Sequence, residues 1–189
     1  MRQFFFLIIV LVLASCSRKT DYKDLVASEG SDKTMFLNKI KLTEDSLAIH
    51  YKLMVNNRAD SLPSEMIQRT IELYETYYRK FPNDSLTATY LDKIHQLHTQ
   101  EKRYFYAVNW VDTLLLRFPK YQHKAEVLYS AATTSDLYLL DTNRVKRYYN
   151  KMLVECPKLK THIKSEIVER LRNLKLSYLD YLKISSTAH

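Results

Sequence analysis

Tyr77-Tyr78-Arg79-Lys80-Phe81-Pro82 decides the fold, because the same kind of ending returns as Leu114-Leu115-Leu116-Arg117-Phe118-Pro119 and as Met152-Leu153-Val154-Glu155-Cys156-Pro157. The three prolines stand 37 and 38 residues apart. Apolar or tyrosine side chains occupy the fourth, fifth and eighth positions before each proline, and these positions share one face of a helix. A proline ring cannot continue helical hydrogen bonding, so each helix is expected to end there. The spacing therefore predicts three similar helices that stack on one another.

Segments with helical periodicity lie before and between these endings. Residues 85–99 and 122–139 carry apolar side chains three or four positions apart, and short polar connections follow them. Residues 33–54 are periodic with Glu44 interrupting the apolar face, and residues 159–183 suit a final capping helix. We therefore expect an all-α solenoid of about three antiparallel helical hairpins plus a C-terminal capping helix over residues 33–184, with a disordered tail at 185–189.

The N-terminus has the pattern of a secretory signal. Arg2 precedes an apolar run from Phe4 to Ala14 that is too short to span a bilayer, and small residues precede Cys16. Residues 1–15 are therefore expected to be a removed signal peptide. The polar stretch 16–32 contains the only glycine and shows no helical periodicity, which predicts a flexible tether. An ordinary secreted protein, in which Cys16 has no special role, is the alternative.

Composition excludes several classes of function. With a single glycine, the chain cannot form a phosphate-cradling loop or a dinucleotide fingerprint. Cys156 is the only cysteine besides Cys16, and it is expected to be buried. No cofactor and no small-molecule substrate are expected. Despite a formal net charge of +8, nucleic acid is not an expected partner, because an exported protein does not meet it routinely.

Two sets of residues resemble known families. Leu13-Ala14-Ser15-Cys16 resembles the signal of bacterial lipoproteins, in which the cysteine is acylated and becomes the first residue. The repeat endings resemble tetratricopeptide repeats, and in particular those of envelope lipoproteins such as the lipoprotein subunit of the outer-membrane β-barrel assembly machinery and small repeat lipoproteins of Bacteroidetes. The residues that match the repeat pattern are Ala107, Val111, Leu114 and Pro119, and then Val145, Tyr149, Met152 and Pro157. His95 departs from this pattern, because the family has a small residue there.

The resemblances imply a protein that is acylated at Cys16 and binds envelope proteins or peptide segments, with outer-membrane protein assembly as the process they favour. Ser17-Arg18-Lys19 lack the acidic residues associated with surface export in Bacteroidetes-type lipoproteins, which implies the periplasmic face of the outer membrane. A scaffold in another envelope complex, for division or secretion, is the alternative. The chain is not expected to be an enzyme. A helical peptidoglycan-degrading enzyme that uses Glu65 or Glu166 as its general acid and base is the less favoured alternative.

Fifteen tyrosines supply candidates for a binding groove. Tyrosine has an apolar body and a polar tip, which binding surfaces favour. Tyrosines on helical stripes also serve as packing residues, so both interpretations stay open. The candidates on the middle hairpins are Tyr90, Tyr104, Tyr106, Tyr129 and Trp110.

Positive charge gathers near the C-terminus, where residues 144–175 hold ten Lys or Arg and three Glu. Such a basic face could meet anionic lipid head groups or an acidic partner, and a solvated helix surface is the alternative. The residues of this face are Arg144, Lys146, Arg147, Lys151, Lys160, Lys164, Arg170, Arg172 and Lys175.

His95 and His98 stand three residues apart, a spacing that can place two imidazoles on one metal ion. No nearby cysteine or carboxylate completes a set of four ligands in the sequence. Surface or interface histidines, and no metal site, are therefore expected.

Overall fold

The structure is a computed structural model that describes residues 22–56 and 61–187. The predicted signal peptide, Cys16 and the first part of the predicted tether lie outside the described residues. Within these ranges the chain forms eight α-helices and one π-helical segment and no strand, so the predicted all-α class is confirmed. The elements are α1 (Tyr22–Val55), α2 (Ser64–Lys80), α3 (Thr87–Gln100), α4 (Tyr104–Arg117), α5 (Lys124–Thr134), η1 (Ser135–Leu139), α6 (Thr142–Glu155), α7 (Thr161–Arg172) and α8 (Tyr178–Thr187).

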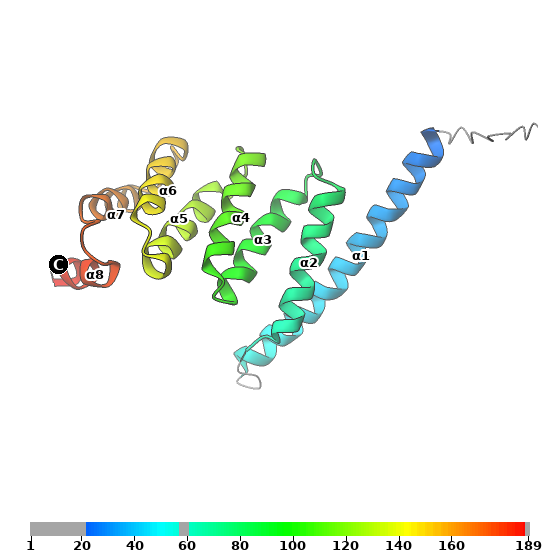
Figure 1. The fold of residues 1–189 in the computed structure, drawn as a ribbon, viewed down its shortest axis with the longest axis horizontal. Coiled ribbons are helices and arrows are strands. Elements are labelled where there is room, and N and C mark those ends of the chain that lie inside the picture. Colours follow the sequence, from blue (N-terminus) through cyan, green and yellow to red (C-terminus); the bar gives the residue numbers. More distant parts are fainter. Residues whose placement is uncertain (1–21, 57–60, 188–189) are drawn as a thin grey trace, which may run out of the picture. The chain divides into compact units, whose positions relative to one another are not determined.

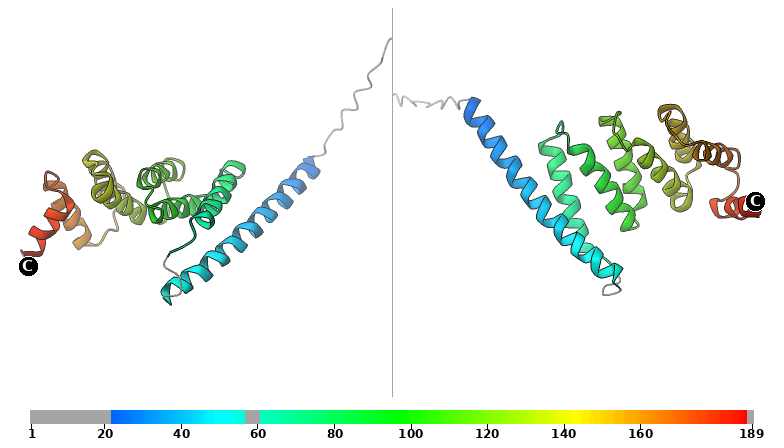
Figure 2. Two further views of the ribbon diagram at one scale, coloured as in Figure 1. Left: turned by 60° about the horizontal axis from the view of Figure 1, so that its bottom comes forward. Right: turned by 180° about the vertical axis from the view of Figure 1, so that it is seen from behind.

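The chain divides into two units, residues 1–37 and residues 38–189, and the boundary falls inside α1. Within the second unit the helices pack in the order of the sequence (Figure 1). The closest packing joins α3 to α4 and α5 to α6 as hairpins, and α2 packs on α3 as α4 does on α5. The view from behind in Figure 2 shows the same succession from α2 to α7. This is the predicted helical-repeat arrangement.

The three proline endings have nearly the same backbone. Phe81, Phe118 and Cys156, which precede the prolines, have φ between −127° and −117° and ψ between 58° and 73°. The proline ring disfavours the α region for the residue before it. Each helix therefore ends two residues before the proline, and Phe81, Phe118 or Cys156 is the first non-helical residue. In each case its N–H still donates to the carbonyl four residues earlier, and its own carbonyl accepts from the N–H three residues later. The repeat is therefore a repeat of conformation as well as of sequence.

The predicted apolar stripe faces the interior. At the fifth, eighth and twelfth positions before each proline, every side chain is buried. These residues are Tyr77, Tyr74 and Thr70 on α2, Leu114, Val111 and Ala107 on α4, and Met152, Tyr149 and Val145 on α6. At the fourth position only Leu115 is buried, whereas Tyr78 and Leu153 are half-buried.

A π-helical segment accounts for the unequal spacing of the repeats. α3 and α5 begin 37 residues apart, at Thr87 and Lys124, but α4 and α6 begin 38 residues apart. The extra residue therefore lies between the starts of α5 and α6, where η1 continues α5 with a wider turn. η1 ends at Leu139, and the next residue, Leu140, has φ 52° and ψ 32°. The N–H groups of Leu140 and Asp141 both donate to the Ser135 carbonyl.

Two sequence expectations about the ends of the domain need correction. α1 begins at Tyr22, within the stretch 16–32 that was expected to be a tether, because a single glycine costs a helix only about 1 kcal/mol. The predicted capping helix over 159–183 is two helices, α7 and α8, and α8 continues to Thr187 into the predicted tail. Ser177 caps α8: its Oγ accepts from the Asp180 N–H at 3.1 Å and donates to the Asp180 carboxylate at 2.7 Å.

Candidate functional site

Exposed aromatic side chains cluster where the first turn of α4 meets η1. The rings of Tyr104 and Tyr138 stack face to face, with centroids 4.0 Å apart and an angle of 6° between their planes. Phe105 and Tyr106 follow on the same turn of α4. Tyr138, Phe105 and Tyr106 are 54%, 55% and 57% exposed, and Leu140 is 74% exposed. We call Tyr104, Phe105, Tyr106, Tyr138 and Leu140 the aromatic patch.

Two arginines lie over rings of the aromatic patch. The Arg144 guanidinium lies 5.1 Å from the centroid of Phe105, and the Arg103 guanidinium lies 5.5 Å from that of Tyr106. Arg103 is held in place by donating to the Gln68 side chain at 2.9 Å. Cation–π contacts of this kind orient the rings while leaving part of each face open. The patch is therefore apolar with a cationic rim.

A buried histidine supports the patch from below. The His98 ring stacks on Tyr106 with centroids 5.7 Å apart, and only 5% of the residue is exposed. Its Nδ1 is the only buried side-chain polar atom without a hydrogen-bond partner among the described residues. Burial and the nearby Arg103 charge lower the pKa of His98, so the ring is neutral at neutral pH.

Both histidines of the considered metal pair are buried rather than on the surface, which corrects that expectation. His95 Nδ1 lies 3.1 Å from the Ala107 carbonyl oxygen, and His95 Nε2 lies 2.9 Å from the Ser130 hydroxyl. Because only an N–H can donate to a carbonyl, this geometry places the proton on Nδ1 and leaves Nε2 to accept from Ser130. Burial lowers the pKa of His95. His95 thus joins α3, α4 and α5, and its larger ring occupies a position where a small residue was expected.

The structure separates the predicted groove residues. Tyr104 and Tyr106 belong to the aromatic patch, as described above. The prediction for Tyr90 was wrong, because Tyr90 is a core residue that stacks on Tyr74 at 4.9 Å. Tyr129 is half-buried and donates to the Glu166 carboxylate at 2.7 Å. Trp110 is half-buried, with its ring edge-on to Tyr78. These five side chains therefore do not form one groove.

Many of the tyrosines join helices through carboxylates. A buried or half-buried phenol that donates to a carboxylate closes a contact between two parts of the chain. Burial raises the pKa of each of these phenols, that of Tyr148 to about 12, so all of them remain donors at neutral pH. The pairs are Tyr74–Glu44, Tyr77–Asp84, Tyr121–Asp92, Tyr129–Glu166 and Tyr148–Asp112, at 2.7 to 3.0 Å. The Glu44 that interrupts the apolar face of α1 is one of these acceptors.

The predicted basic face is also divided. Arg170 is only 2% exposed and makes two 2.7 Å bonds to the Asp136 carboxylate, so assigning it to a surface was wrong. Arg147 pairs with Asp112 at 2.7 Å, Arg144 with Asp141 at 3.3 Å, and Lys151 with Glu155 at 4.0 Å. Lys164 donates to the Pro157 carbonyl. The remaining members are exposed, namely Lys146, Lys160, Arg172 and Lys175.

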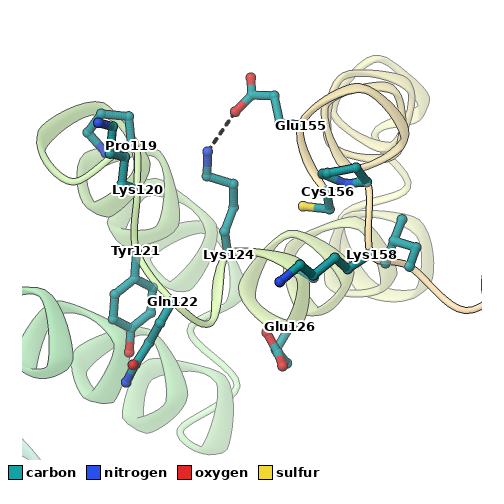
Figure 3. Close-up of a pocket in the computed structure, with 12 residues that line it drawn as sticks. Pro119, Lys120, Tyr121, Gln122, Lys124, Glu126, Glu155, Cys156 and Lys158 are labelled. Atoms are coloured by element: carbon teal, nitrogen blue, oxygen red, sulfur yellow. Dashed lines mark hydrogen bonds and ion pairs between the residues drawn. The ribbon is translucent and has the colours of Figure 1, made fainter.

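Two hollows lie in series along the edge of the stack where the proline turns are. One of about 560 Å³ lies between the start of α3 and the turn after α4, and one of about 530 Å³ lies between the start of α5 and the turn after α6. Eight residues of the first lining have a counterpart in the second at the repeat spacing, and the two hollows share the turn Pro119–Gln122 as a wall. Figure 3 shows the second hollow, with the Lys124–Glu155 pair joining its two sides at 2.9 Å.

The groups considered for catalysis and metal binding do not come together in one site. Glu166 accepts the Tyr129 bond described above, and Glu65 is exposed and pairs with Arg69 at 3.3 Å. Cys156 is buried, as expected, and burial raises the pKa of its thiol. In the part of the chain that the structure describes, no three His, Cys, Asp or Glu residues lie close enough to hold a metal ion. None of the described helices combines the length and apolar character needed to cross a membrane.

Comparisons with known proteins add no relative. A scan against protein-family models gives no matching family, and searches of the curated proteins and of the solved structures give no match. Function is therefore inferred from the surfaces of the molecule itself.

Proposed function

We propose that this protein is a membrane-anchored adaptor of the bacterial envelope that binds a segment of a partner protein on its aromatic patch. The observation that carries the proposal is the patch itself, in which four exposed side chains lie on the first turn of α4, on η1 and on the residue after η1. Aromatic side chains with arginine neighbours are the residues most often found at the energetic centre of protein interfaces.

The backbone around the patch supports the same proposal. Leu140 is held in the left-handed region, where a side chain costs about 1–2 kcal/mol, and it is exposed rather than packed. A π-helical segment and a strained, exposed leucine together are typical of a site shaped for function rather than for stability.

The remaining parts of the proposal rest on the sequence. The resemblance of the repeat endings favours a tetratricopeptide-like adaptor, and Leu13-Ala14-Ser15-Cys16 favours acylation of Cys16 and attachment to the periplasmic face of the outer membrane. Two or three acyl chains would hold the protein there durably. Outer-membrane protein assembly is the process favoured by the resemblance, and a scaffold for division or secretion is the second candidate.

Site-specific crosslinking in cells tests the proposal. A photo-crosslinking residue at Phe105 or Tyr138 should capture an envelope protein, whereas the same residue at Ile49 or Leu179, which are 59% and 62% exposed and lie on other helices, should not. Phe105→Ala should weaken capture from position 138 without changing the helical circular dichroism. In parallel, mass spectrometry should find Cys16 acylated, and Cys16→Ser should release the protein from membranes. Equal crosslinking at all four positions would contradict the patch, and an unmodified Cys16 would contradict the anchor.

A further inference from the structure

We propose that the two hollows along the proline turns form a continuous docking site, the trough, for an extended acidic segment of a partner protein. The trough is a different surface from the aromatic patch, since the patch lies at the first turn of α4 and the trough lies beyond its last turn. The inference extends the proposed adaptor function to a second partner surface.

The construction of the trough favours an extended occupant. Residues Ser85, Ala88 and Thr89 line the first hollow, and their counterparts 37 positions later line the second. Residues 117–121 of the first turn correspond in the same way to residues 155–159, at 38 positions. Two hollows of similar size and construction, with a shared wall, suit a chain that passes over one and then the other. A single compact ligand would use only one of them.

The charges in the trough favour an acidic occupant. Arg117, Lys120 and Lys158 line it, are exposed, and have no ion-pair partner among the described residues. Lys120 and Lys158 each follow a proline, so the cation repeats with the turn. In Figure 3 the Lys158 side chain extends into the space between the two turns.

Two carboxylates line the trough against the four cations Arg117, Lys120, Lys124 and Lys158, and one of the two carboxylates is paired within the chain. Glu155 accepts from Lys124 at 2.9 Å, and this hydrogen bond lowers the pKa of its carboxyl. Glu126 lies 4.0 Å from the His123 ring. The net field that an approaching segment meets is therefore positive, which steers acidic chains toward the trough and repels basic ones.

The spacing of the trough sets the pattern of the probe. Packed helices lie about 8–10 Å apart, and equivalent turns of the trough lie two helices apart, at most about 16–20 Å. An extended chain covers that distance with about six residues, so every second Glu of a three-residue repeat can meet an equivalent position. The probe is a dye-labelled peptide of five Glu-Ser-Ala repeats. Matched peptides carry Gln or Lys in place of Glu, and an oligothymidylate of equal charge tests other polyanions.

Fluorescence anisotropy with the full chain in detergent tests the proposal. The Glu peptide should bind more tightly than the Gln peptide, and the Lys peptide should not bind. The double variant Lys120→Glu, Lys158→Glu should weaken binding about tenfold, because two attractive contacts become repulsive. Lys146→Glu, an exposed substitution on α6 outside the trough, should change binding less than about twofold.

Four results would overturn the proposal: equal binding of the Gln peptide, unchanged binding by the double variant, an equal loss in Lys146→Glu, or tighter binding of the oligothymidylate. Circular dichroism of each variant confirms that the helices remain, which is expected because all three lysines are exposed. Crosslinking from Phe105 is measured separately. A negative result in the peptide-binding experiment would therefore contradict the trough without contradicting the aromatic patch, and a negative crosslinking result would contradict only the patch.

Discussion

The two edges of the stack that meet the ends of α4 are built differently. At the proline edge, Phe81, Phe118 and Cys156 share one backbone conformation and one pattern of turn hydrogen bonds. At the opposite edge, the Arg103 N–H in the α3–α4 connection donates to the His98 carbonyl five residues earlier. In the α5–α6 connection, the Asp141 N–H donates to the Ser135 carbonyl six residues earlier.

This difference shows where a helical repeat accommodates an extra residue. A proline fixes its own φ and restricts the residue before it, so the proline edge keeps its register. The α3–α4 and α5–α6 connections at the opposite edge contain no proline, and the 38-residue repeat fits there by widening the end of α5 into η1. That irregular edge is also where Tyr138 and Leu140 become exposed.

The largest effect is expected from breaking the pair that holds the irregular edge. Arg170 reaches from α7 to Asp136 in η1 and also donates to the carbonyls of Asn173 and Leu176, which form the turn before α8. Arg170→Ala would leave the Asp136 carboxylate buried without its partner, and should lower the free energy of unfolding by about 3–5 kcal/mol in urea denaturation.

Two further variants make this prediction specific. The double variant Arg170→Met, Asp136→Leu should recover most of the loss, because no charge then remains buried. Arg172→Ala, two residues away and exposed, should change stability by less than about 0.5 kcal/mol. A loss in Arg172→Ala as large as that in Arg170→Ala would show that the edge does not depend on the buried pair.

An intermediate effect is expected at alkaline pH, where the hydrogen bonds between buried tyrosines and carboxylates are lost. Tyr148 on α6 donates to Asp112 on α4, and burial raises its pKa to about 12 from the ordinary value of 10.0. A phenol with a raised native pKa stabilises the fold fully below pH 10 and loses that contribution as pH rises through about 12. Stability measured by urea denaturation should therefore fall across this window.

Tyr148→Phe should make that fall measurably smaller, because one of the buried phenols can no longer ionise, while lowering stability at neutral pH by roughly 1 kcal/mol. Tyr106→Phe, on an exposed ring, provides the matched control and should leave the alkaline slope nearly unchanged. If Tyr148→Phe gave the wild-type slope, the alkaline loss would come from other tyrosines.

The smallest effect is expected at Leu140. Because its φ of 52° suits glycine better than leucine, Leu140→Gly should raise the free energy of unfolding by about 1 kcal/mol. Leu116→Gly, at an exposed position inside α4, should lower it by about 1 kcal/mol. Thermal melts of the pair sharpen the comparison: if Leu140→Gly were destabilising, the exposed leucine would be packed rather than strained.

Some of the fold could be read from the sequence because its determinants are local. The proline steric rule and the apolar positions within two turns of a helix are set by residues near one another in the chain, which is why α2, α4 and α6 end where expected. The break between α7 and α8 also had a local signal, since Ser177 and Asp180 have the spacing of a helix N-cap and its third residue. The apolar periodicity continues across the break, and it favoured a single helix.

The candidate site was only partly predictable. Tyr104 and Tyr106 were identified because they are aromatic and lie on a middle hairpin, but nothing in their spacing distinguishes them from Tyr90, which is buried. The unequal proline spacing was the available signal for η1, and with it for Tyr138 and Leu140. The extra residue of the 38-residue repeat is accommodated at the edge without these proline turns, because the prolines restrict the backbone at the other edge.

The sequence by itself determined that the chain is helical, where the repeated helices end, and which stripe of each is buried. Those features follow from periodicity and from proline sterics, which act within a few residues. The burial of Arg170, the five bonds between tyrosines and carboxylates, and the position of the unpaired lysines along the trough follow only from the tertiary structure. The Arg170–Asp136 pair and four of the five tyrosine bonds join side chains that lie 29 to 37 positions apart along the chain, as Tyr121 and Asp92 do, and such pairs meet only when neighbouring helices pack.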